Sequence, residues 1–362
     1  MVIQNSTSMQ QMFVVLSSFL CTYNLLNRTT NKQYSFMMFV RMIIKRIFRI
    51  SPVYLLIVGF AATWWPCISD GPLWPAIVEA ESKVCRNKFW AHAFFVNNLV
   101  EPDKFCVLPT WYMALDIQMY IIALSVSFTV GRMRRGVIPT LSILLIASIV
   151  MNAALAYLYE WKPLVYFASV TENIRTILRD VPSLKYMYMS PWGNLPACIL
   201  GILVGHSYKY MLDKPIDKKK YMWLLYPLYM ISLPLPLGFI LSGGFIQDVE
   251  QPIILAVYAA IEKSVLQILA IFLYVMFSIM DSSVLKFCSW KGWVVLSRLC
   301  LSVMILHWCV ALVILGESPQ PVPVSAINIL TVGVATTTFT FILALPLTLL
   351  VEMPMKSVCD AI

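Results

Sequence analysis

Basic residues gather in alternate gaps between long apolar runs, and this pattern constrains the fold more than any other feature of the sequence. Sixty per cent of the 362 residues are apolar, 12% are charged and the mean hydropathy is +0.77. In soluble domains about a quarter of the residues are charged. A run of about 18 or more apolar residues can cross roughly 30 Å of hydrocarbon. The chain is therefore predicted to cross a membrane several times.

Apolar runs of spanning length occur along most of the chain. The strong runs lie near 110–130, 137–158, 191–212, 221–243, 252–280, 293–315 and 325–351, and the weaker ones near 12–26 and 47–65. Helices satisfy their own backbone hydrogen bonds in lipid, so we predict an all-α, multi-pass protein with about nine transmembrane helices. The whole chain, 1–362, is expected to form one membrane domain with outside loops at about 66–109 and 159–190.

The charges also predict an orientation. Five gaps between the apolar runs, here called the basic gaps, hold 18 of the 27 Lys and Arg residues. They are 28–49, 131–136, 209–220, 281–292 with Arg298, and the C-terminal tail. Twelve of the 18 acidic residues are assigned to the predicted outer side, five fall in the basic gaps and Asp116 lies within an apolar run. Because basic residues near helix ends resist translocation, we expect Met1 outside or in the lumen and Ile362 in the cytosol, at the plasma membrane or endoplasmic reticulum. The net charge of +9 needs no nucleic acid, since topology and attraction to anionic inner-leaflet lipids account for it.

Three of the nine cysteines, Cys67, Cys85 and Cys106, share the first outside loop. An oxidising compartment favours one disulfide there, with the third cysteine left over. Metal binding is the weaker interpretation, because the loop has one histidine and no Cys-x-x-Cys pair.

A basic stripe precedes Ser51-Pro52 and is formed by Arg41, Lys45, Arg46 and Arg49. On a helix, positions 41, 45 and 49 align and Arg46 lies beside them. Guanidinium groups bind phosphate oxygens in pairs, so the stripe suits the phosphates of a nucleotide-tailed carrier such as acyl-CoA. The alternative is an anchor at the cytosolic interface, and spacing alone favours that alternative.

A carboxylate lies within the apolar run that begins at Thr110. Tyr112, Asp116 and Tyr120 recur every four residues and would share one helix face. An ionisable group in a spanning helix normally faces a polar cavity or a partner, so Asp116 is either part of a site or paired with another helix. The aromatic pair of Trp111 and Tyr112 also fits a belt at the membrane interface.

A single histidine, His307, lies in the middle of the 293–315 run. An intramembrane histidine can shuttle protons or act as a general base. It can also bond a neighbouring helix, which the pattern alone favours. Glu262 and Lys263 interrupt another apolar run, and their charges can neutralise each other.

Several motifs follow one another in a characteristic order. They are Arg46 and Arg49 before Pro52, Cys85 to Trp90, Asn97-Asn98, Cys106, Thr110 to Gln118, Pro191 to Gly205, Leu296 to His307, and Val351 to Pro354. In this order and spacing the chain resembles the nose-resistant-to-fluoxetine type of invertebrate membrane protein, which carries an acyltransferase-3 membrane domain. The resemblance spans essentially the whole chain.

The resemblance implies transfer of an acyl group from acyl-CoA, a co-substrate and not a bound cofactor, to a hydroxyl of a lipid or carbohydrate. Arg46 and Arg49 would hold the donor's phosphates, and no metal is implied. Tyr112, Asp116 and His307 would line the catalytic cavity. Cys85 and Cys106 would form the loop disulfide.

The chain also departs from the family pattern. Family members carry a histidine, the expected catalytic base, upstream of the segment that Met9 to Leu26 matches, and many animal members carry a cysteine-rich extracellular domain before that. Gln11, Ser18 and Leu115 stand where the family has Asp, Gly and Asn. Loss of a general base removes about 10² to 10⁴ in rate. The alternative function is therefore lipid or hydrophobic-drug transport or binding without catalysis.

Overall fold

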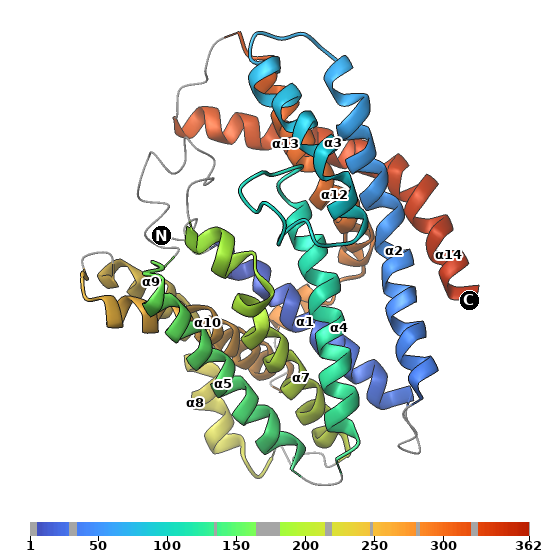
Figure 1. Cartoon of the computed structure of the whole chain (residues 1–362). Coiled ribbons are helices and arrows are strands. Elements are labelled where there is room, and N and C mark those ends of the chain that lie inside the picture. Colours follow the sequence, from blue (N-terminus) through green and yellow to red (C-terminus); the bar gives the residue numbers. More distant parts are fainter. Residues whose placement is uncertain are drawn as a thin grey trace. The chain divides into compact units, whose positions relative to one another are not determined.

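The structure is a computed structural model that describes most of the chain. The described residues are 6–28, 35–133, 136–163, 182–213, 219–246, 249–279, 283–319 and 325–361. Every regular element within these ranges is helical, and no strand occurs there (Figure 1). The predicted all-α class is confirmed.

Seven helical segments of the described chain are long and apolar enough to cross a membrane. They are Thr110–Gly131, Val137–Leu158, Leu184–Leu212, Met222–Ser242, Pro252–Phe277, Lys291–Gly316 and Ile327–Val358. These correspond to the seven strong apolar runs. The two weaker runs fall in the long helices α1 (Ser6–Arg28) and α2 (Phe36–Thr63), which are not among the seven. The protein is an integral, multi-pass membrane protein.

The chain divides into two compact units, and each unit combines segments that are distant in sequence. Unit 1 comprises Met1–Phe39 and Gln118–Ser289, and unit 2 comprises Val40–Ile117 and Trp290–Ile362. The single membrane domain expected from the sequence therefore contains two separately packed bodies.

Unit 1 contains most of the spanning helices. After α1, its described elements are the later part of α4 (Thr110–Gly131), α5 (Val137–Leu158), η4 (Leu184–Tyr188), α7 (Pro191–Asp213), α8 (Met222–Ser232), α9 (Pro234–Ile246), α10 (Pro252–Ile279) and α11 (Ser283–Cys288). The run near 221–243 is divided between α8 and α9, and α9 begins at a proline. Proline lacks the amide hydrogen that would continue the preceding helix.

Two glycines allow α7 to approach α1 closely in unit 1 (Figure 1). A Cβ atom at Gly201 would lie 2.4 Å from the carbonyl oxygen of Val15, and one at Gly205 would lie 3.0 Å from Thr22. Helices in lipid associate through such close contacts, because lipid provides no hydrophobic force between them. The Gly-x-x-x-Gly element thus determines how α7 packs on α1.

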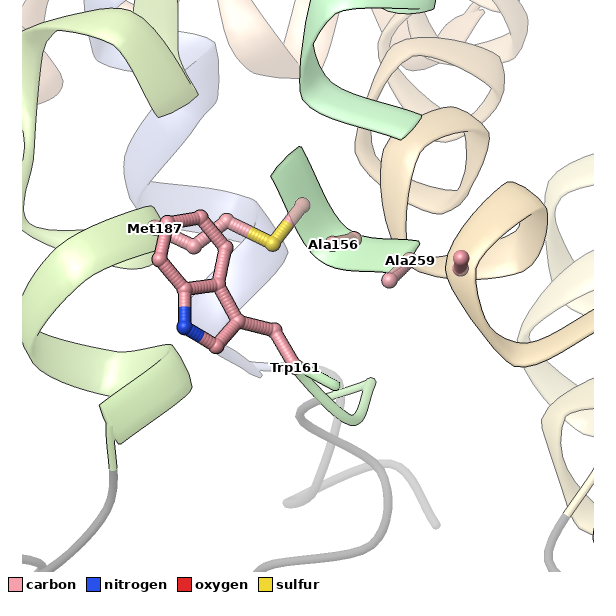
Figure 2. Packing of buried hydrophobic residues seen from close by; sticks show 5 residues of the cluster. Ala156, Trp161, Met187 and Ala259 are labelled. Carbon is pink, nitrogen blue, oxygen red and sulfur yellow. The ribbon is translucent and has the colours of Figure 1, made fainter. Parts of the chain in front are cut away.

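A small apolar cluster joins α5, η4 and α10 at one end of unit 1. Figure 2 shows the indole of Trp161 beside the side chain of Met187, with Ala156 and Ala259 next to them. Ala256 completes the cluster, and all five residues are buried. Small side chains on α5 and α10 allow their backbones to come close, which positions η4 against α10.

Unit 2 contains the polar features predicted for a site. Its described elements are most of α2, η1 (Trp65–Cys67), η2 (Pro75–Glu79), α3 (Ala80–Ala93), the start of α4, α12 (Lys291–Gly316), α13 (Ala326–Leu347), η5 (Thr348–Glu352) and α14 (Met353–Ala361). The region predicted as the first outside loop is largely helical. It contacts the end of α12, where Leu73 N donates to Gly316 O at 3.4 Å.

Candidate functional site

An ion pair between α2 and α4 is the central polar feature of unit 2. The Arg46 guanidinium donates from Nη2 to both Asp116 carboxylate oxygens, at 2.7 and 2.8 Å, and from Nε to Oδ2 at 3.1 Å. The Asp116 side chain is 5% exposed and that of Arg46 is 26% exposed. A pair bonded through two donor nitrogens is well oriented as well as charge-compensated.

This geometry changes the interpretation of both residues. The sequence assigned Arg46 to a cytosolic basic gap and Asp116 to an apolar span, whereas the structure brings their side chains into contact. Asp116 has a partner on another helix, as one of the two sequence interpretations proposed. Arg46 faces a carboxylate, and its expected role toward donor phosphates is not seen directly. Tyr112, one turn before Asp116 on α4, is buried and packs edge-on against Trp111.

The rest of the basic stripe is more open. Arg41 and Arg49 are exposed, and Lys45 is half-buried. Arg49 attracts the carboxylate of Glu352, to which Ser302 Oγ donates at 3.3 Å. Unit 2 thus brings three motif segments together: the Arg-x-x-Arg element of α2, the α12 segment and the closing Glu-x-Pro.

His307 does not join the ion pair. Its Nδ1 is 3.2 Å from the carbonyl oxygen of Val303, one turn earlier on α12. No other hydrogen bond of His307 occurs among the described residues, so the expected bond to a neighbouring helix is absent there. Because a carbonyl oxygen only accepts, Nδ1 is the donor in this contact.

A buried polar network connects α2, α3 and the start of α4. The Tyr54 hydroxyl is 2.7 Å from His92 Nδ1 and 3.3 Å from Asn97 Oδ1. Asn97 Nδ2 donates to Thr110 Oγ1 at 3.3 Å, and Thr110 Oγ1 donates to Cys106 O at 2.8 Å. Burial, aided by nearby positive charge, lowers the pKa of His92 to about 3. His92 is therefore neutral at physiological pH.

Lys88 holds the loop that follows α3. Its buried Nζ donates to the carbonyl oxygens of Asn97, Glu101 and Lys104 at 3.1, 3.1 and 2.9 Å. Burial lowers the pKa of Lys88 to about 8, partly offset by the negative charges of Glu101 and Asp103. The three carbonyls take the place of water around the ammonium group.

A disulfide joins Cys85 and Cys106, with Cα atoms 4.7 Å apart. This is the pair that the family resemblance implies, and Cys67 is free and exposed. The buried Glu81 accepts from Val107 N and from Trp308 Nε1, both at 2.8 Å. In the part of the chain that the structure describes, His, Cys, Asp and Glu do not gather in a group that could hold a metal ion.

Sequence reasoning missed the buried polar face of α3. Glu81, Cys85, Lys88 and His92 are all buried. Their spacing of four, three and four residues is the period of one helix face, and this was the available signal. The sequence predicted an outside loop at about 66–109, where no helix face was expected.

Two curated proteins of Caenorhabditis elegans are similar to parts of the chain. "Nose resistant to fluoxetine protein 6" is 25% identical over 166 residues, which cover 45% of this chain and 19% of that protein. "Regulator of hypoxia-inducible factor 1" is 24% identical over 228 residues, which cover 59% of this chain and 43% of that protein. The first match supports a relation to nose-resistant-to-fluoxetine-like proteins. No family model matches the chain, and no solved structure matches it significantly.

The matched regions span less than half of each relative's own length. The similarity therefore supports a relation over the matched regions alone. The activities of the complete relatives are a separate question.

Proposed function

We propose that the chain is a membrane-bound acyltransferase that moves an acyl group, other than an aminoacyl group, from acyl-CoA to a hydroxyl of a lipid or carbohydrate. The observation that carries the proposal is the arrangement of unit 2. Arg46 is oriented by a buried carboxylate, and Arg49 lies nearby on the same helix with an exposed side chain. The order of motifs and the partial similarity to the nose-resistant-to-fluoxetine protein support it.

Arg46 and Arg49 have different parts in this proposal. Asp116 holds two nitrogens of the Arg46 guanidinium, so Arg46 is rigid and only partly exposed. Arg49 is the more accessible cation and would make the main contact with the donor's phosphates. Phosphate oxygens suit a guanidinium because both present paired, planar contacts.

His307 would act as the general base, with Tyr112 and Asp116 lining the site. His307 Nδ1 donates to Val303 O, so Nε2 can take the proton of the acceptor hydroxyl. The hydroxyl oxygen then attacks the thioester carbonyl, an ester forms, and CoA leaves as a thiolate that receives a proton.

The second candidate function is lipid or hydrophobic-drug transport or binding without catalysis. The observation that favours it is the Arg46–Asp116 pair itself, because a pair that satisfies both charges needs no substrate. In that case the pair only stabilises unit 2.

Acyl-CoA-dependent labelling separates the two functions. The double variant Arg46→Ala/Arg49→Ala should abolish labelling of the acceptor if the protein is an acyltransferase, while lipid uptake should continue if it is a transporter. Arg49→Ala alone should reduce labelling at least tenfold, an effect about the size of one lost charge-assisted phosphate contact. His307→Gln should reduce it by about 10² to 10⁴.

Arg132→Ala is the matched control. Arg132 is an exposed basic residue directly after α4, and its guanidinium lies 4.3 Å from the centre of the Phe128 ring. Labelling should be unchanged in this variant. Acyl-CoA-dependent labelling that persists in the Arg46→Ala/Arg49→Ala variant would contradict the acyltransferase proposal.

We further propose that the N-terminus is outside or luminal and the C-terminus cytosolic. Two free, exposed cysteines test this orientation, because Cys67 is expected outside and Cys288 in the cytosol. A membrane-impermeant maleimide should label Cys67 in sealed vesicles of outside-out orientation, and Cys288 only after permeabilisation. The reverse pattern would invert the topology.

A further inference from the structure

A chain of side-chain amides crosses unit 1 from η4 to α10. Asn194 Nδ2 donates to the carbonyl oxygens of Tyr188 and Ser190, at 2.7 and 2.8 Å. Asn194 Oδ1 accepts from Gln11 Nε2 at 2.8 Å, and Gln11 Oε1 accepts from Gln267 Nε2 at 2.8 Å. Each amide orientation is determined by the one before it. The chain of hydrogen bonds therefore ends on an acceptor, the Oε1 atom of Gln267.

Two buried polar atoms on one face of α10 have no hydrogen-bond partner among the residues that the structure describes. Gln267 Oε1 is one, in a residue that is 1% exposed, and Lys263 Nζ is the other, in a residue that is 7% exposed. The two residues are four positions apart, so they lie one above the other on the helix. One atom can only accept a hydrogen bond and the other can only donate.

The surrounding elements enclose both atoms. Lys263 Nζ lies 4.7 Å from the centre of the Tyr188 ring, and the Tyr188 hydroxyl donates to Gln10 on α1. Gln10 precedes Gln11, which is bonded to Gln267. Residues of α1, η4 and α10 thus lie together at Lys263 and Gln267. All of these residues belong to unit 1.

The position of Lys263 makes an unpartnered ammonium unfavourable. Lys263 lies near the middle of the span Pro252–Phe277, and the apolar cluster with Ala256 and Ala259 precedes it on the same face. Charged side chains at this depth normally pair with another group. The Tyr188 ring compensates the charge only in part, since a ring face is a weaker partner than an oxygen acceptor.

Glu262 adds a negative charge without completing the site. It attracts Lys263, but neighbouring helix positions point about 100° apart, and no ion pair between these two residues occurs within the described ranges. Glu262 nevertheless balances the charge of Lys263. A neutral ligand head that offers one acceptor and one donor would therefore match the site better than a full anion.

We propose that α1, η4 and α10 form a binding site for the protonated carboxyl group of a long-chain fatty acid. Its carbonyl oxygen accepts from Lys263 Nζ, and its hydroxyl donates to Gln267 Oε1. A protonated carboxyl group presents an acceptor and a donor on one carbon atom. The depth of Lys263 leaves the acyl chain within the hydrocarbon region. The acyl-transfer proposal rests on residues of unit 2, so each proposal can fail without the other.

Equilibrium binding of radiolabelled palmitic acid to the full chain in lipid nanodiscs tests the site. Saturable binding of about one molecule per chain is expected, and Lys263→Met and Gln267→Leu should each weaken binding at least tenfold. Lys209→Gln is the control, because this lysine of unit 1 has its own partner, Asn27. Methyl palmitate, which has no donor hydrogen, should not compete.

Absence of saturable binding, equal binding by Lys263→Met, or effective competition by methyl palmitate would overturn the proposal. A second measurement uses the unaltered protein, so that it does not depend on how the variants fold. A palmitic acid analogue with a diazirine beside the carboxyl group should label peptides of α10, α1 or η4. Labelling confined to other peptides would also overturn it.

Discussion

The two units bury polar groups in opposite ways. In unit 2 the buried charges have partners: Asp116 is paired with Arg46, and Lys88 donates to three carbonyl oxygens. In unit 1 neutral amides bond to one another, and Lys263 Nζ has no hydrogen-bond partner within the described part of the chain. Removing one partner of a buried ion pair lowers the stability of the fold strongly. A neutral hydrogen-bond network that ends on an open acceptor contributes less stability and can bind a ligand. Unit 2 is therefore expected to be more sensitive to single substitutions.

The largest effect is expected when the ion pair of unit 2 is broken. Asp116→Leu leaves the partly buried Arg46 without its counter-ion and should lower the free energy of unfolding by about 3–5 kcal/mol. Thermal unfolding in detergent measures this. The double variant Arg46→Leu/Asp116→Leu should recover part of the loss, and Asp70→Asn, at an exposed carboxylate, should have little effect. Similar stability of Asp116→Leu and the native protein would remove the contrast between the units.

The next effect is expected at the disulfide. The double variant Cys85→Ser/Cys106→Ser lacks the disulfide, whose two cysteines are 21 residues apart in sequence. It should lower the free energy of unfolding by about 3 kcal/mol. Non-reducing peptide mapping of the native protein should recover the two cysteines linked. Cys67→Ser is the control, since this thiol is free. Two free thiols at positions 85 and 106 in freshly isolated protein would refute the pairing.

A pH effect of intermediate size is expected at His92. Burial keeps its pKa at about 3, so it stays neutral in the folded protein, whereas in the unfolded chain it is protonated below about 6.5. The unfolded state then binds more protons, and stability is lost as the pH falls from about 6.5 toward 3. Between pH 7 and pH 5 the loss should be about 2 kcal/mol. The free energy of unfolding of His92→Gln, measured at pH 7 and pH 5, should differ between the two pH values by this amount less than that of the native protein. The same pH dependence in both proteins would contradict the buried, neutral state of His92.

The smallest effect is expected in unit 1. Gln11→Leu removes one hydrogen bond to Asn194 and one to Gln267, and polar contacts between membrane helices are worth only about 0.6–2 kcal/mol. Thermal unfolding should therefore show a loss of about 1 kcal/mol. Gln251→Leu, at an exposed position before α10, is the control. A loss as large as that of Asp116→Leu would mean that neutral and charged networks contribute alike.

The helices could be predicted from the sequence, because any segment that crosses lipid must contain a long apolar run. The seven strong runs all became spanning helices, although the 221–243 run is divided between α8 and α9. The candidate site could be predicted from the sequence only in part. Arg46 and Asp116 were each singled out, but their pairing was not, because helix spacing orders residues along one element and does not give the rotation of one helix against another.

The two features that sequence reasoning missed share a cause. Lys88 and Gln267 are polar residues whose role depends on burial, and burial depends on which elements pack around them. The spacing of Glu81, Cys85, Lys88 and His92 carried a usable signal, whereas nothing in the sequence linked Gln11 to Gln267, which are 256 positions apart.

The sequence by itself determined that this is a helical, multi-pass membrane protein, where most of its spans lie, and which side chains were candidates for chemistry. These properties follow from local composition, because each segment that crosses lipid must satisfy its own backbone hydrogen bonds. Only the tertiary structure decided that Arg46 meets Asp116, that His307 Nδ1 lies against the carbonyl oxygen of Val303, and that Gln11 connects Asn194 to Gln267. Such outcomes depend on contacts between distant segments, which no local pattern specifies.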